Sequence, residues 1–127
     1  MTWLIAAFLI AHGAAHLPVW LPPSPSDAGP QAPFAPDHSA LLTRTRVPQA
    51  TSRRIAVRLA GTAAVLYVVA GLGVALGSGW AVAMAAAAAI VGLALKVLYF
   101  NPWLTVGIFL DAAVLSAALL SWPVGLV

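Results

Sequence analysis

The stretch "LAGTAAVLYVVAGLGVALGSGWAVAMAAAAAIVGLAL" (residues 59–95) contains no charged side chain. A membrane-spanning helix needs about 20 predominantly apolar residues, so this stretch is too long for one span and long enough for nearly two. The segment "GSGW" (residues 77–80) interrupts it near its middle, and glycine is disfavoured inside a helix. We therefore predict two consecutive transmembrane helices, near residues 55–76 and 80–100.

Two further apolar stretches complete the pattern, at residues 3–21 and 103–122. Asn101 and Pro102 separate the last helix from the one before it, because proline cannot continue the hydrogen-bond ladder of a helix. No Lys or Arg precedes residues 3–21, and the apolar run continues to its end. This favours a retained helix over a cleaved signal peptide.

The composition independently indicates a membrane protein. Of the 127 residues, 62% are hydrophobic and 7% are charged, with a mean hydropathy of +0.98. A soluble domain carries about 25% charged residues, so a soluble fold is excluded. We predict a single all-α transmembrane domain: a four-helix bundle of up-down topology, with a long proline-rich loop (residues 22–54) between its first two helices. The glycine spacing of residues 73–77 predicts close helix packing within the chain.

The tryptophans fall at the predicted helix ends, where their amphipathic rings favour the membrane interface. The five expected interface anchors are Trp3, Trp20, Trp80, Trp103 and Trp122.

Basic residues gather in or beside the loop, and we expect them to contact anionic lipid head groups. They are Arg44, Arg46, Arg53, Arg54 and Arg58. The positive-inside rule then makes the loop cytoplasmic and both termini extracytoplasmic, in a bacterial cytoplasmic membrane. The net charge of +3 is small, and no basic run has interleaved aromatic residues, so we expect no nucleic-acid partner. Cysteine is absent, which excludes disulfides and thiolate metal ligands.

Four ionisable side chains fall well inside the predicted spans: His12, His16, Lys96 and Asp111. At 1.5 Å per residue they lie about 6 to 14 Å from the cytoplasmic helix ends, in the same half of the bilayer. The two histidines are four residues apart and share one face of the first helix. The first and last helices of a compact bundle are usually neighbours, so we expect a His–Asp contact. Lys96 can reach Asp111 or extend to the head groups.

The sequence leaves three interpretations of this cluster open. It can be a structural pairing that fixes helix register. It can pass protons or a small solute, because histidine titrates near neutrality. It can also bind a divalent metal through His12, His16 and Asp111, with His38 as a possible additional ligand. Tyr67, in the middle of the second helix, would need one hydrogen bond from a neighbour.

Three segments resemble a group of uncharacterised small four-helix integral membrane proteins from bacteria, mainly actinobacteria. They are "AHGAAHLPVWLPP" (11–23), "PFAPDHSALL" (33–42) and "LYFNPWLTVGIFLDAAVL" (98–115). The resemblance implies a membrane location and assigns no activity.

No nucleophile motif is recognisable, so the favoured interpretation is an accessory or structural membrane component without catalytic residues or activity. We expect no cofactor, with a divalent metal as the alternative. The expected partners are the lipid bilayer and either a second copy of the chain or another membrane protein.

The predicted topology can be checked with a reporter fused after Val127. Alkaline phosphatase, which is active only outside the cytoplasm, should be active there, because the predicted helices return the chain to its starting side. If a reporter that is active only in the cytoplasm were active at the same position, the orientation would be the opposite of the predicted one.

Overall fold

The computed structural model describes residues 1–21 and 38–121. The proline-rich part of the predicted loop (22–37) and the predicted anchor Trp122 lie outside the described residues.

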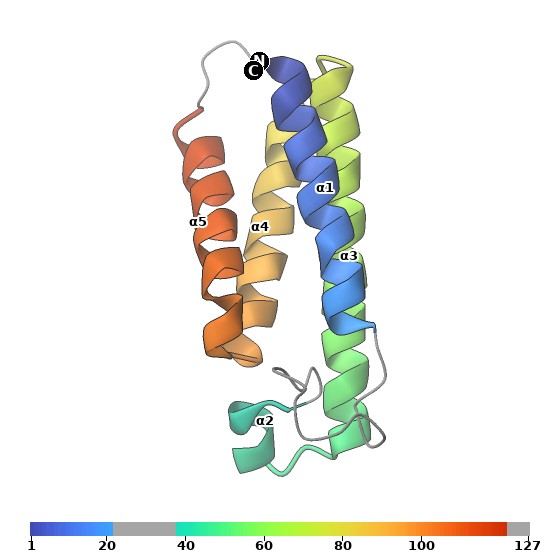
Figure 1. The fold of residues 1–127 in the computed structure, drawn as a ribbon, viewed down its shortest axis with the longest axis vertical. Helices are drawn as coiled ribbons and strands as arrows, with labels where there is room; N and C mark the ends of the chain where they lie inside the picture. The colour runs from blue at the N-terminus through green and yellow to red at the C-terminus, as the bar shows by residue number, and fades with distance from the viewer. Residues whose placement is uncertain (22–37, 122–127) are drawn as a thin grey trace.

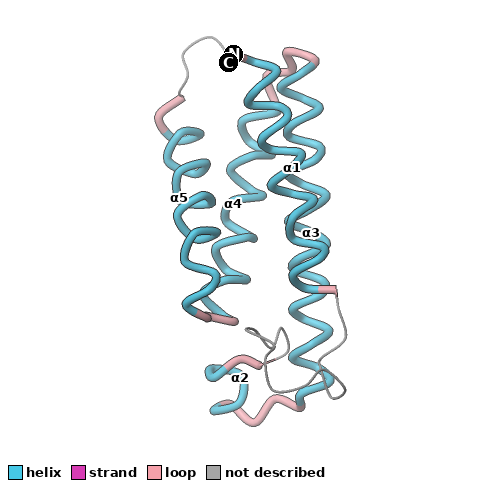
Figure 2. The backbone as a smooth tube through the Cα atoms, viewed as in Figure 1, coloured by secondary structure: helices cyan, strands magenta, loops and turns pink. Residues whose placement is uncertain are grey.

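The described chain is helical and contains no strand (Figure 2). Its long helices are α1 (Thr2–Trp20), α3 (Gln49–Ala75), α4 (Ala81–Leu98) and α5 (Thr105–Leu119). A short 3-10 helix, η1 (Pro102–Leu104), directly precedes α5. Within residues 1–21 and 38–121, four helical segments are long and apolar enough to cross a membrane. The predictions of an all-α chain and of four long apolar helices are therefore confirmed.

Helix α3 begins at Gln49, before the start predicted near residue 55. Pro48 occupies the position just before the helix, and proline is well suited to helix starts because its missing N–H would have no partner there. The extra turns carry Ser, Thr and Arg side chains. Apolarity defines where a span can lie, whereas a helix can continue beyond it.

A short helix, α2 (Ala40–Arg44), lies within the region predicted as loop. Ser39 caps it, because its Oγ accepts a hydrogen bond from the Leu42 N–H at 3.2 Å. The same hydroxyl donates to the Leu98 carbonyl at 2.6 Å. One side chain thus both starts α2 and attaches it to the end of α4.

Consecutive long helices pack side by side (Figure 1). Helix α1 lies tightly on α3, since Gly13 faces Ala64 and Tyr67 while Gly71 faces Ala6 and Ile10. This order of contacts makes α1 and α3 antiparallel. The backbones of α1 and α5 make little or no close approach, although we expected the first and last helices to be direct neighbours. Side chains bridge the two helices instead.

The turn between α3 and α4 depends on Gly77, whose φ of +65° is in the left-handed region. The Ser78 N–H donates to the Gly73 carbonyl at 2.9 Å, and the Gly77 N–H donates to the Val74 carbonyl at 3.1 Å. This pattern of hydrogen bonds is a Schellman motif, which favours glycine at its left-handed residue. Gly73 also lies against the ring of Trp80, whereas nothing lies within 4 Å of a Cβ added at Gly77. Of the two spaced glycines, Gly73 therefore serves packing within the chain and Gly77 serves the turn.

The predicted tryptophan anchors differ in exposure. Trp3 and Trp103 are 73% and 74% exposed and Trp80 is 49% exposed. Trp20 is only 1% exposed, and its ring meets that of Tyr99 edge to face at 5.6 Å. Trp20 is therefore part of a core cluster between α1, α3 and α4. Its ring contacts protein on all sides, and its place at the membrane interface stays a prediction.

The close contact between α1 and α3 predicts that Gly13→Ala destabilises the protein. An added Cβ would lie 2.7 Å from the Tyr67 Cβ and 2.9 Å from the Ala64 carbonyl oxygen, and overpacking costs about 1–3 kcal/mol. Gly61→Ala is the matched control, because nothing lies within 4 Å of its added Cβ. Unfolding of both variants by SDS titration should show a loss for Gly13→Ala alone. Equal stability of the two would contradict the close packing.

Candidate functional site

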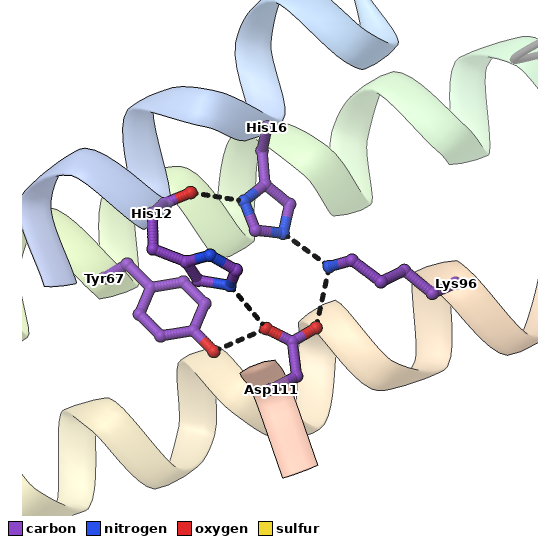
Figure 3. Close-up of polar contacts among 5 residues, drawn as sticks. All are labelled: His12, His16, Tyr67, Lys96 and Asp111. Atoms are coloured by element: carbon purple, nitrogen blue, oxygen red, sulfur yellow. Dashed lines mark hydrogen bonds and ion pairs between the residues drawn. The ribbon is translucent and has the colours of Figure 1, made fainter. Parts of the chain in front are cut away.

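Five side chains from the long helices meet in the interior and form what we call the polar network (Figure 3). Its members are His12 and His16 of α1, Tyr67 of α3, Lys96 of α4 and Asp111 of α5. The network therefore connects every long helix of the described chain.

Asp111 is the centre of the network. Its Oδ1 accepts hydrogen bonds from the Tyr67 hydroxyl at 2.7 Å and from His12 Nε2 at 2.8 Å. Its Oδ2 pairs with Lys96 Nζ at 2.7 Å. Asp111 is completely buried and is the one buried residue of α5. This carboxylate thus joins α5 to the other three long helices, while Val114 and Leu115 of α5 pack against the apolar core.

His16 completes the connections of Lys96. The Lys96 ammonium donates to His16 Nε2 at 2.9 Å, and His16 Nδ1 donates to the His12 carbonyl at 3.0 Å. An ammonium has no acceptor, so Nε2 must be the acceptor and the proton of this imidazole is on Nδ1. His16 is therefore neutral in this geometry, and the Lys96 and Asp111 charges balance each other.

Aromatic contacts orient the His12 ring. The His12 and Tyr67 rings are nearly perpendicular, at a centroid distance of 4.8 Å and an angle of 88°. The Phe8 ring stacks on the His12 ring from one turn earlier, at 5.7 Å. These contacts hold the imidazole with Nε2 directed at Asp111.

Two glycines make room for the network. A Cβ at Gly92 of α4 would lie 2.5 Å from Asp111 Oδ2, and one at Gly107 of α5 would lie 2.6 Å from Lys96 Cε. Gly107 is four residues before Asp111 and therefore lies on the same helix face, which can be read from the sequence. Nothing in the sequence indicated the role of Gly92, which becomes visible only when α4 and α5 are in contact.

The structure brings together the four ionisable residues expected inside the spans. Lys96 is 4% exposed and bonds to Asp111, so the alternative that it extends to the head groups is not adopted. Tyr67 finds its hydrogen bond on the same carboxylate. His38 is exposed and does not belong to the group formed by His12, His16 and Asp111.

The histidines and Asp111 are also close enough to consider a metal. One ligand atom from each lies within 4.8 Å of the others. Lys96 Nζ, however, is hydrogen-bonded to both His16 and Asp111. A divalent cation bound by all three residues would have to displace this ammonium or stand beside it, and like charges in hydrocarbon are strongly unfavourable.

The arginines lie away from the polar network, in α2, the turn after it and the first part of α3 (Figure 1). Four are exposed: Arg44, Arg46, Arg54 and Arg58. Arg53 is half-buried, and its Nη2 donates to the Leu21 carbonyl at 3.5 Å. Positive charge is thus concentrated at the end of the bundle where α1 ends and α3 begins.

No protein-family model, curated protein or solved structure matches the chain. The resemblance to small bacterial four-helix proteins accordingly stays a prediction, and the function has to be argued from the polar network itself.

Because the Asp111 carboxylate lies directly against Gly92, Gly92→Ala should lower the free energy of unfolding by about 1–3 kcal/mol, as overpacking does. Asp111 has a short side chain held by three partners, so it cannot move away from a new Cβ.

Gly107→Ala is the comparison, because its Cβ would meet the flexible methylenes of Lys96. We expect it to cost less than Gly92→Ala in the same SDS titration. A larger loss of stability for Gly107→Ala would show that the packing against the Asp111 carboxylate is less restrictive than the packing against Lys96.

Proposed function

We propose that the chain is a four-span protein of a bacterial cytoplasmic membrane that acts as an accessory or structural component without catalytic activity. The observation that supports it best is that the Lys96 ammonium is paired with the Asp111 carboxylate and that the buried polar atoms have hydrogen-bond partners. Throughout the described residues, no buried side-chain nitrogen or oxygen lacks a hydrogen-bond partner. In hydrocarbon, such pairing is what makes buried polar groups tolerable.

The network acts between helices, which is what a structural role requires. Each bond of Asp111 goes to a different helix: α1 through His12, α3 through Tyr67 and α4 through Lys96. Hydrogen bonds to charged groups contribute about 1.5–3 kcal/mol each. Taking a substrate into the network would break at least one of these interhelical contacts, so the arrangement favours a fixed bundle.

The up-down path and the orientation are part of the proposal. The arginines are at one end of the bundle, and residue 1 and the end of α5 are at the other (Figure 1). The positive-inside rule supports a cytoplasmic location for the arginine-rich end, where the exposed guanidinium groups would meet anionic lipid head groups. The termini would then be extracytoplasmic.

A proton-linked or small-solute carrier is the second candidate. A continuous series of bonds runs from His12 through Asp111 and Lys96 to His16 within the predicted spans. Ionisable groups inside a membrane often mark proton or ion pathways. Metal binding is a third candidate, supported by the proximity of both histidines to Asp111.

A double-mutant cycle on Lys96 and Asp111 tests the structural role. Asp111→Asn leaves a buried ammonium without its carboxylate, and Lys96→Met leaves the carboxylate without its ammonium, so each should cost about 3–5 kcal/mol. The double variant has no unpaired charge, and its asparagine oxygen can still accept from His12 and Tyr67. It should be more stable than either single variant in an SDS titration.

Ser116→Ala is the control on α5, because Ser116 is exposed and its loss should change stability by less than about 0.5 kcal/mol. Additive losses from the two network substitutions would show that their charges are not coupled, and would contradict the proposal.

Purified wild-type protein in proteoliposomes separates the candidate functions. We expect no pH-dependent proton flux above that of empty vesicles, and no stoichiometric metal by elemental analysis. A flux abolished by Asp111→Asn would identify a carrier, and a bound metal lost in His12→Gln would identify a metal protein. Either result would overturn a purely structural role.

A further inference from the structure

A groove of about 220 Å³ lies between α1 and α5, which we call the α1–α5 groove. Phe8 and Leu9 form its wall on α1, and Val114 and Ala117 form its wall on α5. Side chains of α4 and one of α3 close its floor. It exists because α1 and α5 are bridged by the polar network but do not pack backbone to backbone.

The groove is apolar along its length. It begins beside Ser121, where α5 ends, and it stops at Phe8 and Leu110, next to the polar network. Among the described residues that line it, Ser121 contributes the one polar side chain. The neighbouring His12 and Asp111 already bond to each other, and the arginines lie toward the opposite end of the bundle. An occupant of the groove would therefore be apolar, with any polar group at the Ser121 end.

Two apolar occupants match such a lining: a hydrocarbon chain, or a helix of a second copy of the chain. Crosslinks between two chains through α1 and α5 would identify the second copy, and the experiments below distinguish the two.

The groove is continuous with the apolar outer surface. Phe8, which lines it, is 41% exposed, and Phe109 and Leu119 on α5 are 71% and 74% exposed. In a bilayer these side chains contact lipid tails. An unfilled groove would leave its lining without dispersion contacts on one side, so lipid is the occupant that the surroundings supply.

We propose that the α1–α5 groove is a lipid-binding site that takes one hydrocarbon chain of a membrane phospholipid, with the head group beside Ser121. The inference rests on the membrane location in the proposed function. It does not require the polar network to be structural.

Photo-crosslinking tests the site directly. The full-length protein is placed in phosphatidylglycerol vesicles containing a trace of the same lipid with a diazirine on its acyl chain. After illumination, mass spectrometry of peptides should show labelling concentrated on residues 5–9 and 110–121. The exposed apolar residues of α3 and α4, such as Val65 and Ile90, provide the background for ordinary lipid contact.

A groove-filling variant gives the second measurement. Ala117→Phe should lower the concentrated labelling about tenfold, the factor produced by a change in binding free energy of about 1.4 kcal/mol. Ala83→Phe is the matched control, because Ala83 is exposed and does not line the groove. It should leave the labelling of residues 5–9 and 110–121 unchanged.

Even labelling of all exposed faces in the wild type would overturn the proposal, whatever the variants do. Undiminished labelling in folded Ala117→Phe would also overturn it, as would crosslinks between two chains through α1 and α5. Carbonate extraction of the vesicles distinguishes the two proposals. Release of the protein by carbonate would overturn the membrane location itself. Retention of the protein together with even labelling would overturn only the lipid-binding site.

Discussion

The ion pair between Lys96 and Asp111 is the constraint on which the arrangement of the helices depends. A carboxylate in hydrocarbon is costly unless it is paired and hydrogen-bonded. Asp111 reaches Lys96 at 2.7 Å only because α4 and α5 face each other at Gly92, which has no side chain to separate them. His12 and Tyr67 satisfy the other carboxylate oxygen. The position of α1 and α3 relative to α5 follows from the same requirement.

The bundle thus has two regions with opposite chemistry between α1 and α5. Where the polar network lies, charged and aromatic side chains fill the space and hold the helices in register. Beyond Phe8 and Leu110 the space is apolar and partly open. A structural role for the first region and a lipid-binding role for the second are compatible, because a rigid attachment at one end maintains the spacing of the groove at the other.

Several features of the fold could be predicted and others could not. Hydropathy and length found the four long helices, and the turn residues Gly77 and Pro102 marked two of their ends. The polar start of α3 was missed, because a span is recognised by its apolar residues. The burial of Trp20 was also missed: its ring packs against that of Tyr99 and is 1% exposed. Residue type alone does not tell whether a tryptophan faces outward or packs into the core.

The sequence by itself determined the four long apolar helices and the four ionisable residues that lie well inside the predicted spans. The distance of a residue from the helix ends, and the helix face on which it lies, are set by its position in the chain. The order of residues alone therefore predicts a similar depth for the ionisable residues His12, His16, Lys96 and Asp111. Only the tertiary structure decided which partner each chose, that Tyr67 shares the carboxylate, and that Gly92 makes room for it. It also left the groove between α1 and α5. These outcomes depend on how each helix is rotated against its neighbours, which packing between distant residues sets.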